Sequence, residues 1–426
     1  MGRLAIDGGE PVNTKPFPMW PSFQKSTVAR AMKPLQTGRV NYWTGEEGMK
    51  FEKEWAAWNG AKFATLTSNG TSALHTALAA LGVGPGDEVV CPSYSFIASS
   101  FCVLQAGALP VFADVDDSHT LDPKAIEARI TKRTRAILVV HLYGVVADLG
   151  PILRLARKHR LYVIEDCAQC FGGRYKGKKA GTLGDAGCFS FCQSKHFTTG
   201  GEGGAVITND EALHWECQSF RDHGYDVQER LRLLELEAKL MYIHKRVGFN
   251  YRMTEMQAVI GRCELARFDS WNLPNRIRNG RYLIRKLKDH PLVLHPPLDT
   301  KERRNAFWWA PFIVDRDRLK VPIKRFIATI AAEGVPVYGV QWPEMYKERA
   351  YVEQNGFGRL RYPFRDPSAR KMDYTQVRCE KARWLKDRTV CFFTHPVYST
   401  RHMQLCVDAF CKVADAYMRP SPAGKA

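Results

Sequence analysis

Short apolar runs alternate with amphipathic stretches from about residue 60 to residue 210. The apolar runs predict buried strands, and the amphipathic stretches between them have the spacing of helices. This alternation is typical of an open α/β sheet with mostly parallel strands, which binds ligands at the carboxyl ends of its strands. The sequence predicts strands at 64–68, 88–93, 110–115, 136–144, 161–167, 188–191 and 204–210, and helices at 70–82, 96–107, 122–130 and 149–159.

The pattern is different after the sheet. Residues 211–269 are rich in helical spacing, and the leucines at 228–240 recur on one helical face that we interpret as a packing or dimer surface. Beyond Trp271, the sequence predicts a long basic helix at 276–290, strands at 306–314 and 335–342, and a helix at 324–334.

This change of pattern predicts two domains. A large domain at 1–270 includes the N-terminal segment, and a smaller α/β domain occupies 271–426. Residues 345–375, which are rich in charge and aromatics with Gly and Pro, predict a long connecting loop, and the tail after about residue 419 predicts disorder.

The net charge of the chain bears on the kind of partner that it binds. The chain has 62 Lys and Arg against 44 Asp and Glu, a formal net charge of +18. A nucleic-acid surface and a solvated basic surface both fit this excess. The basic residues are spread along the chain without a nucleic-acid motif, so we expect no nucleic-acid partner. A preference for anionic small substrates is compatible with the charge.

The twelve cysteines and the apolar runs indicate the compartment. No run of 18 apolar residues occurs, and the opening MGRLAIDGGE lacks the apolar core of a signal peptide. Cys167 and Cys170 form a CxxC, but no second pair follows at zinc spacing, so we interpret them as buried small hydrophobes and expect no metal. We expect a cytoplasmic protein with reduced thiols and no membrane contact.

One lysine stands between a predicted strand and a glycine-rich loop. The stretch FSFCQSKHFTTGGEGG places Lys195 directly after the strand at 188–191. A desolvated lysine amine is a nucleophile suited to forming a Schiff base with an aldehyde. A surface cation or a phosphate clamp is the alternative interpretation of this segment.

Two polar residues follow the preceding strand. In LYVIEDCAQ, Asp166 ends an almost wholly apolar run, and Gln169 comes three residues later. A carboxylate paired with a protonated pyridine nitrogen holds pyridoxal phosphate as an electron sink, and Gln169 is placed to reach the phenolic oxygen of that ring. A carboxylate that only caps the next turn is the alternative.

Two further segments fit the same cofactor. TLTSNGTSALHTAL predicts a strand, a turn and a helix that begins near Thr71 and Ser72, where free amides and hydroxyls suit a phosphate. An ordinary helix cap needs only one of these hydroxyls. In CPSYSF, Tyr94 or Phe96 is suited to stack on an aromatic cofactor, with core packing as the alternative.

In this order, the motifs resemble the DegT/DnrJ/StrS family of aminotransferases, which use pyridoxal phosphate to aminate keto sugars and cyclitols. The resemblance runs from about Gly38 to beyond Ala310. It rests on GEEGMKFEKEWAAWNGAK, SNGTSALHTALAALGVGPGDEVVCPSYSF, VVHLYGVVADL, VIEDCAQCFGGRYKGKKAGTLGDAGCFSF and GFNYRMTEMQAVIG.

The resemblance implies a fold-type I, aspartate-aminotransferase-like architecture and a homodimer with active sites between the protomers. It implies that Lys195 forms the Schiff base, that Asp166 and Gln169 contact the cofactor ring, and that Phe96 stacks on it. The phosphate positions it implies are Gly70, Thr71, Ser72 and Ser190, together with Asn250 of the other subunit.

The expected reaction moves an amino group from glutamine or glutamate to a keto sugar or keto cyclitol. The opening IDGGEPV and the HLYG and EDCAQ motifs most resemble members that aminate inososes in aminoglycoside biosynthesis. The alternatives are a nucleotide-linked keto-sugar aminotransferase, a dehydratase or 3-amino-5-hydroxybenzoate-type synthase of the same family, and a non-catalytic regulator.

Two features of this chain leave questions for the structure. The loop after the lysine contains Gly201, one residue more than the TTGEGG form of the family, so the direction of Glu202 is open. His196 is offset by one position from the histidine that replaces the lysine in the dehydratases of the family. Four further residues are expected to border the cleft: Tyr42, Arg252, Tyr338 and His395.

Overall fold

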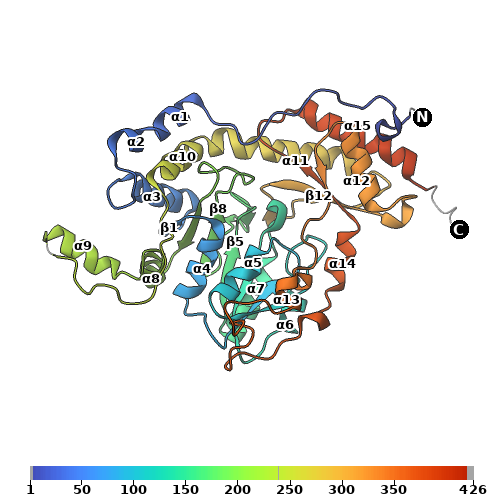
Figure 1. The fold of residues 1–426 in the computed structure, drawn as a ribbon. Helices are drawn as coiled ribbons and strands as arrows, with labels where there is room; N and C mark the ends of the chain where they lie inside the picture. The colour runs from blue at the N-terminus through green and yellow to red at the C-terminus, as the bar shows by residue number, and fades with distance from the viewer. Residues whose placement is uncertain (1–2, 238, 420–426) are drawn as a thin grey trace.

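A twisted seven-stranded sheet forms the centre of the computed structural model, which describes residues 3–237 and 239–419 (Figure 1). Strands β8, β5, β4, β2 and β3 are parallel, and β9 runs antiparallel to its neighbours β1 and β8. The order across the sheet is β1 (Phe63–Thr67), β9 (Gly204–Thr208), β8 (Ala186–Ser190), β5 (Tyr162–Asp166), β4 (Thr134–Val140), β2 (Glu88–Pro92) and β3 (Leu109–Ala113). The predicted mostly parallel α/β sheet is confirmed.

Helices cover both faces of this sheet, because its strands are apolar on both sides. Val89 and Cys91 of β2 belong to one buried cluster, and Val90 between them belongs to the other. The first cluster includes helices α4 (Gly70–Ala80), α5 (Ala98–Gln105) and α8 (Glu211–Arg221). The second includes α3 (Glu47–Asn59), α6 (Pro123–Glu127), α7 (Leu149–His159) and α10 (Glu255–Ala266).

The C-terminal part contains a four-stranded antiparallel sheet with its own apolar core. Its order is β10 (Val293–His295), β12 (Trp309–Val314), β14 (Thr389–Phe393) and β13 (Val337–Tyr338). Three helices pack on it: α11 (Leu273–Leu287), α12 (Ile323–Ala332) and α15 (Thr400–Tyr417). The strands at 306–314 and 335–342 are shorter than predicted, and β14 and α15 were not predicted.

The N-terminal segment connects these two parts. Leu4 packs in the C-terminal core, and the Ala5 N–H donates to the Glu333 carboxylate at 2.9 Å. From there the chain runs along the top of the molecule in Figure 1 to helices α1 (Lys25–Ala31) and α2 (Lys33–Thr37). The domain boundary at residue 270 stays a prediction, and the expected disorder after about residue 419 falls on residues outside the described part.

The segment predicted as a connecting loop packs on the main sheet. It holds short helical turns, and Tyr351 and Tyr374 lie in the first cluster with Phe112 of β3. Its turns and the helix after it are η5 (Met345–Lys347), α13 (Arg349–Val352), η6 (Tyr374–Gln376) and α14 (Glu380–Lys386). Buried aromatics therefore fix a stretch that has little regular structure.

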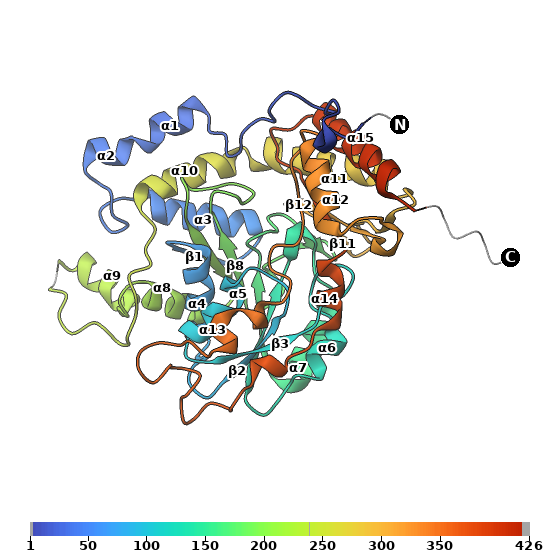
Figure 2. The ribbon, with the colours of Figure 1, turned by 45° about the vertical axis from the view of Figure 1, so that its right-hand side comes forward.

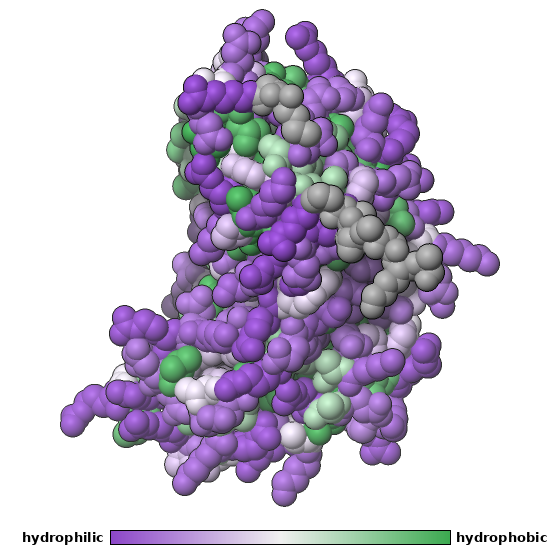
Figure 3. All heavy atoms as spheres, turned by 90° about the vertical axis from the view of Figure 1, so that its right-hand side faces the viewer, coloured by the Kyte–Doolittle hydropathy of each residue, from purple (hydrophilic) through white to green (hydrophobic). Residues whose placement is uncertain are grey.

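Two peripheral elements complete the fold. Strands β11 (Arg303–Arg304), β6 (Arg174–Tyr175) and β7 (Lys178–Lys179) form a small sheet, and helix α9 (Val227–Glu235) projects away from the main sheet (Figure 2). The face shown in Figure 3 is mostly hydrophilic with scattered apolar spots. Within 3–237 and 239–419, no helix combines the length and apolar character needed to cross a membrane.

Candidate active site

A cavity of about 740 Å³ opens at the carboxyl ends of the parallel strands. The loops after β1, β2, β5 and β8 supply one wall, and residues of the C-terminal part supply the other. Eight of the nine predicted site residues line it: Gly70, Thr71, Ser72, Phe96, Asp166, Gln169, Ser190 and Lys195. The fold therefore gathers side chains that lie up to 125 positions apart in the sequence.

A larger and more open hollow, of about 1040 Å³, lies at the opposite ends of the strands. Tyr162 at the start of β5 and Asp185 just before β8 line it. The Asp185 carboxylate accepts a hydrogen bond from the Val163 N–H at 2.7 Å, which ties it to the sheet. The predicted chemical groups lie in the smaller cavity.

Lys195 is held by its main chain and lies half-buried in the wall of the cavity. Its N–H donates to the Cys192 carbonyl at 3.0 Å, and its Nζ lies 4.6 Å from the centre of the Trp308 ring. Burial lowers the pKa of the Lys195 ammonium, and the charges of Asp166 and Glu202 partly offset this effect. Loss of the ammonium proton, which gives the nucleophilic amine, is therefore easier than for a lysine in water.

Asp166 ends β5 at the floor of the cavity. Its carboxylate accepts hydrogen bonds from Ser99 Oγ at 2.8 Å and from the Ala168 N–H at 3.0 Å. Burial raises the pKa of Asp166, and these two hydrogen bonds offset only part of the rise. A cationic partner in the cavity would stabilise the charged carboxylate.

Gln169 is fixed by one end of its amide. Its Oε1 accepts the Tyr143 N–H at 2.7 Å, where Tyr143 has a positive φ of 58°. No hydrogen bond to another described residue uses its Nε2, so that group keeps its two donors for a ligand.

The start of α4 is both a helix cap and an anion site. Asn69 and Ser72 form a capping box, in which the Ser72 N–H donates to Asn69 Oδ1 at 2.8 Å and the Asn69 N–H donates to Ser72 Oγ at 3.1 Å. Ser72 is thereby occupied, as the alternative interpretation of this segment allowed. The N–H groups of Gly70 and Thr71, at the first helical positions, and the Thr71 hydroxyl remain for an anion.

Gly70 and Ser190 bring two strand ends into close approach. A Cβ on Gly70 would lie 2.5 Å from the Ser190 Cβ, which no side chain tolerates. Ser190 Oγ accepts the Cys192 N–H at 3.3 Å. The glycine therefore lets the serine hydroxyl lie beside the free end of α4.

Aromatic side chains form the wall opposite the sheet. Trp308 and Trp309 stack at 4.2 Å, and Trp309 stacks on Tyr338 at 5.9 Å. Phe96 is 42% exposed and meets Trp342 edge-on at 5.0 Å. Sequence reasoning missed the two adjacent tryptophans as site residues, because their run FWWAPFIV has the apolar pattern of a core strand.

Some expected residues lie elsewhere. Asn250 is exposed and does not line the cavity of its own chain, as its assignment to the other subunit requires. Of the four residues expected at the cleft, only Tyr338 lines the cavity. Tyr42 is buried and donates to Glu52, Arg252 pairs with Asp222, and His395 stacks on the Trp20 ring at 5.7 Å.

The structure shows where Glu202 and His196, the two residues that the sequence left open, lie relative to the cavity. Glu202 lines the cavity although its loop contains Gly201, which has a φ of 127° and open space around it. His196 points away, because its Nε2 bonds to the Ala306 carbonyl at 3.2 Å and its ring stacks on Phe171. Burial and the nearby charge of Arg276 hold the pKa of His196 well below its usual value, so this histidine is neutral.

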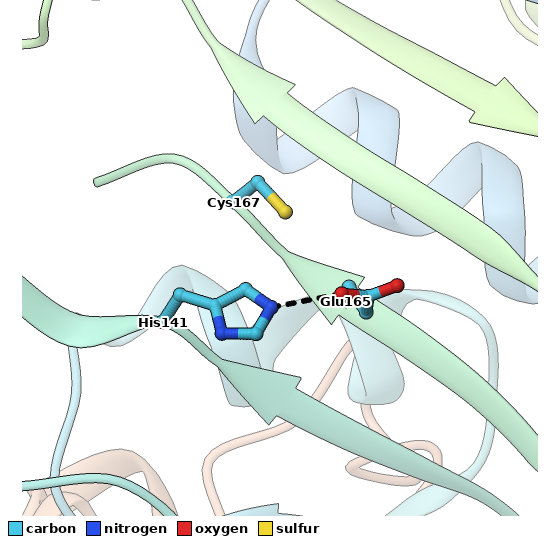
Figure 4. Close-up of side chains that lie close together, drawn as sticks. All are labelled: His141, Glu165 and Cys167. Carbon is cyan, nitrogen blue, oxygen red and sulfur yellow. Dashed lines mark hydrogen bonds and ion pairs between the residues drawn. The ribbon is translucent and has the colours of Figure 1, made fainter. Parts of the chain in front are cut away.

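His141, Glu165 and Cys167 lie close together behind the cavity (Figure 4). The Glu165 carboxylate accepts four hydrogen bonds, from His141 Nε2 and from the N–H groups of Gly181, Leu183 and Gly184. The second nitrogen of His141 accepts the Ala147 N–H at 3.1 Å. With these lone pairs in use, the cluster fits a structural anchor for β4 and β5 better than a metal site.

The chain is similar to a family model, to two curated proteins and to a solved structure. The model of the DegT/DnrJ/EryC1/StrS aminotransferase family matches residues 21–410. A GDP-perosamine synthase of Caulobacter vibrioides is 48% identical over 261 residues, which cover 61% of this chain and 67% of that protein. An L-glutamine:2-deoxy-scyllo-inosose aminotransferase of Streptoalloteichus tenebrarius is 32% identical over 403 residues, or 92% of both chains. The crystal structure of an aminotransferase from Psychrobacter cryohalolentis superposes with a TM-score of 0.84 at 35% identity and covers 94% of this chain and 99% of its own.

Proposed function

Because the chain belongs to the DegT/DnrJ/EryC1/StrS aminotransferase family and is an enzyme, we propose that it transfers an amino group with pyridoxal phosphate. The donor is glutamine or glutamate, and the acceptor is a keto sugar or keto cyclitol. The observation that carries the proposal is the cavity in which Lys195, Asp166 and the free end of α4 meet.

The residues of this cavity fit the cofactor. The close approach of Gly70 to Ser190 leaves a cradle that a Cβ would fill, and two free N–H groups and the Thr71 hydroxyl face it as phosphate donors. Asp166 is a buried carboxylate whose hydrogen bonds come from Ser99 and Ala168, and no ion pair within 4 Å joins it to a Lys, Arg or His of the described residues, which suits a protonated pyridine nitrogen. Phe96 supplies an exposed aromatic face for the ring.

When bound, pyridoxal phosphate supplies an aldehyde and an electron-withdrawing ring. Lys195 would hold the cofactor through that aldehyde, and its amine is placed to take and return a proton at the reacting carbon as general base and acid. Asp166 would stabilise the positive ring nitrogen. Burial favours the neutral form of Lys195, which is the form that accepts a proton.

We infer an uncharged, polyhydroxylated acceptor of the inosose type. Among the described residues, Lys195 is the one Lys, Arg or His that lines the cavity, while Asp166 and Glu202 are acidic. A nucleoside diphosphate carries negative charges that call for further cations. The alignment with the inosose aminotransferase over 92% of both chains supports the same substrate class.

The proposed enzyme is a homodimer. Exposed apolar side chains flank Asn250 on its own segment, with Tyr242 96%, Val247 83% and Phe249 43% exposed. A second copy that covers them would bring Asn250 toward the phosphate of its partner. We also propose a cytoplasmic location, because all twelve cysteines are free thiols.

The first test is spectroscopic. The wild-type protein with pyridoxal phosphate is expected to absorb at about 400–430 nm through the covalent link, and Lys195→Ala is expected to lose this band. A wild-type protein that cannot be made to absorb there would disprove the cofactor assignment.

The second test concerns the acceptor. Amine transfer from glutamine is compared for scyllo-inosose analogues and for nucleotide-linked keto sugars, with the products identified by mass spectrometry. Transfer to the cyclitols supports the proposal, and transfer to nucleotide sugars alone contradicts it. A product that has lost a hydroxyl group identifies a dehydratase, and an aromatic product identifies a 3-amino-5-hydroxybenzoate-type synthase.

A further inference from the structure

Three consecutive carbonyls around the lysine are held by side chains from distant parts of the chain. Trp308 Nε1 donates to the Ser194 carbonyl at 2.5 Å, and Trp20 Nε1 donates to the Lys195 carbonyl at 3.1 Å. Asn272 Nδ2 donates to the His196 carbonyl at 2.6 Å. We call these three donors, together with Arg276, the carbonyl clamp.

Arg276 lies at the centre of the carbonyl clamp. Its Nη2 approaches the carbonyls of Lys195 at 3.5 Å and His196 at 3.4 Å, and its Nη1 approaches the Trp308 carbonyl at 3.4 Å. Its Nε donates to Asn272 Oδ1 at 2.9 Å. The guanidinium thus hydrogen-bonds to the lysine loop and to two of the three other members of the clamp, Asn272 and Trp308.

The arginine is buried without a counter-charge. It has no exposed surface, and no carboxylate among the described residues forms an ion pair with it. Burial lowers the pKa of Arg276 to about 9. A buried unpaired charge destabilises the fold, whereas neutral donors such as the tryptophans hold carbonyls at little cost.

The surroundings show how the charge is tolerated. The carbonyl oxygens of Lys195, His196 and Trp308 point their negative ends at the guanidinium, and the Trp20 ring lies 5.1 Å away. These dipoles stabilise the charge only while the lysine loop keeps its present conformation. The charge and the loop conformation are therefore coupled.

We propose that Arg276 is a positioning residue for Lys195, whose guanidinium fixes the main chain of the lysine loop so that only the lysine side chain moves during the reaction. The inference rests on the proposed function, in which Lys195 bonds to the cofactor in one step and carries a proton in the next. A fixed Cα keeps the amine within reach of the same carbon in both steps, and a displacement of about 1 Å costs roughly 10²-fold in rate.

The test compares Arg276→Met, which removes the charge, with Arg276→Lys, which keeps it. Arg285→Met is the matched control, because Arg285 lies on the same helix, is exposed and stacks on Tyr282. The half-reaction with glutamine is followed as loss of absorbance at about 400–430 nm. The limiting rate and the half-saturating glutamine concentration are obtained separately.

A second readout needs no cofactor. In the apoprotein, the rate at which trinitrobenzenesulfonate modifies Lys195 is measured against pH by mass spectrometry of the lysine peptide. This rate reports the access and the pKa of the amine, so it responds to a change in the lysine loop itself.

Arg276→Met is expected to lower the limiting rate by about 10- to 100-fold, with the half-saturating glutamine concentration within about twofold. The rate at which Lys195 is modified in this variant is expected to change by about threefold or more. Arg276→Lys is expected to recover part of both effects, and Arg285→Met is expected to match the wild type. Unchanged limiting rate and unchanged modification in Arg276→Met would overturn the proposal. Equal losses in the Met and Lys variants, in step with their melting temperatures, would show a merely structural role and would also overturn it.

If Arg276→Met does not fold, Arg276→Lys and Trp20→Phe decide the matter. Trp20 is only half-buried, and the phenylalanine removes one donor to the Lys195 carbonyl. Both variants are expected to change Lys195 modification in the apoprotein, and wild-type behaviour of both would refute the clamp. Failure of the wild type to form the absorbing species would instead refute the proposed function, since the apoprotein measurement does not depend on it.

Discussion

At the scale of single residues, the cavity pairs two groups whose surroundings disfavour their charges. Burial lowers the pKa of Lys195 and raises the pKa of Asp166, so it disfavours the charged form of both. A cofactor with a basic ring nitrogen and an aldehyde would change both residues, since it offers a cation to Asp166 and a covalent partner to Lys195. The prediction for Asp166 follows from its role as the partner of that cation.

Asp166→Asn is expected to reduce the rate of amine transfer by about 10²–10³-fold, because the amide does not stabilise a positive ring nitrogen. The measurement is kcat for amine transfer at saturating cofactor. Asp185→Asn is the control, since Asp185 is an exposed carboxylate whose hydrogen bond lies at the other end of the sheet. An Asp166→Asn enzyme with wild-type kcat would contradict the assigned role.

Gly70→Ala is expected to weaken cofactor binding by about 5- to 150-fold. The new Cβ would lie 2.5 Å from the Ser190 Cβ, and relief of such a clash costs about 1–3 kcal/mol. The measurement is a titration of the apoprotein with pyridoxal phosphate. Gly84→Ala is the control, because the nearest atom to its Cβ lies at 3.8 Å, and equal binding by the two variants would argue against the cradle.

At the scale of elements, helix ends position the site. Helix α10 begins with a capping box of Thr254 and Gln257, in which the Thr254 N–H donates to Gln257 Oε1 at 3.0 Å. The other end of the same amide, Gln257 Nε2, donates to the Glu202 carbonyl at 2.8 Å. The cap of one helix is thus continuous with the loop that follows the lysine.

Thr254→Ala is expected to lower the free energy of unfolding by about 1 kcal/mol, because the Gln257 N–H loses its acceptor. Urea denaturation measures this as a lower midpoint with an unchanged slope. Thr254→Ser keeps the hydroxyl and is expected to retain most of the stability. A Thr254→Ala protein as stable as the wild type would show that the cap contributes nothing.

The elements also show what the sequence could and could not predict. The alternation between residues 60 and 210 predicted every strand of the main sheet, because strands buried on both faces form continuous apolar runs. Helix α15 was not predicted, although its buried residues Met403, Cys406, Val407, Phe410, Val413 and Ala414 recur at the three- and four-residue spacing of an amphipathic helix. Trp308, Trp309 and Arg276 were missed as site residues. Neither apolar spacing nor a basic helix reveals which side chains turn toward a distant loop.

At the scale of the whole molecule, buried histidines make stability depend on pH. Burial lowers the pKa of His75 and His214 to about 4 and that of His119 to about 3. Below the usual pKa of about 6.5 the unfolded chain binds protons that the native protein does not. This contribution to stability is therefore complete above pH 6.5 and is lost as the pH falls toward 4.

Urea unfolding of the apoprotein between pH 7.5 and 4.5 is expected to show falling stability, with each histidine contributing at most about 1.4 kcal/mol per pH unit. His75→Gln removes one of these groups and is expected to flatten the dependence below pH 6. A variant with the same pH dependence as the wild type would show that His75 is not neutral in the native state.

The proposed dimer predicts that two inactive proteins restore activity when their subunits mix. A hybrid of Lys195→Ala and Asn250→Ala subunits has one cavity that lacks both groups and one cavity with its own Lys195 and the intact Asn250 of its neighbour. Random exchange makes half of the dimers hybrid, so about a quarter of the wild-type activity is expected, measured after the mixture is unfolded and refolded together. The control mixes Lys195→Ala with Asp166→Asn, two residues that line one cavity of the same chain, so that each cavity of the hybrid lacks one group and no activity returns. Equal inactivity of both mixtures would place Asn250 outside the partner's site, and the exposed apolar segment around it would then need another explanation.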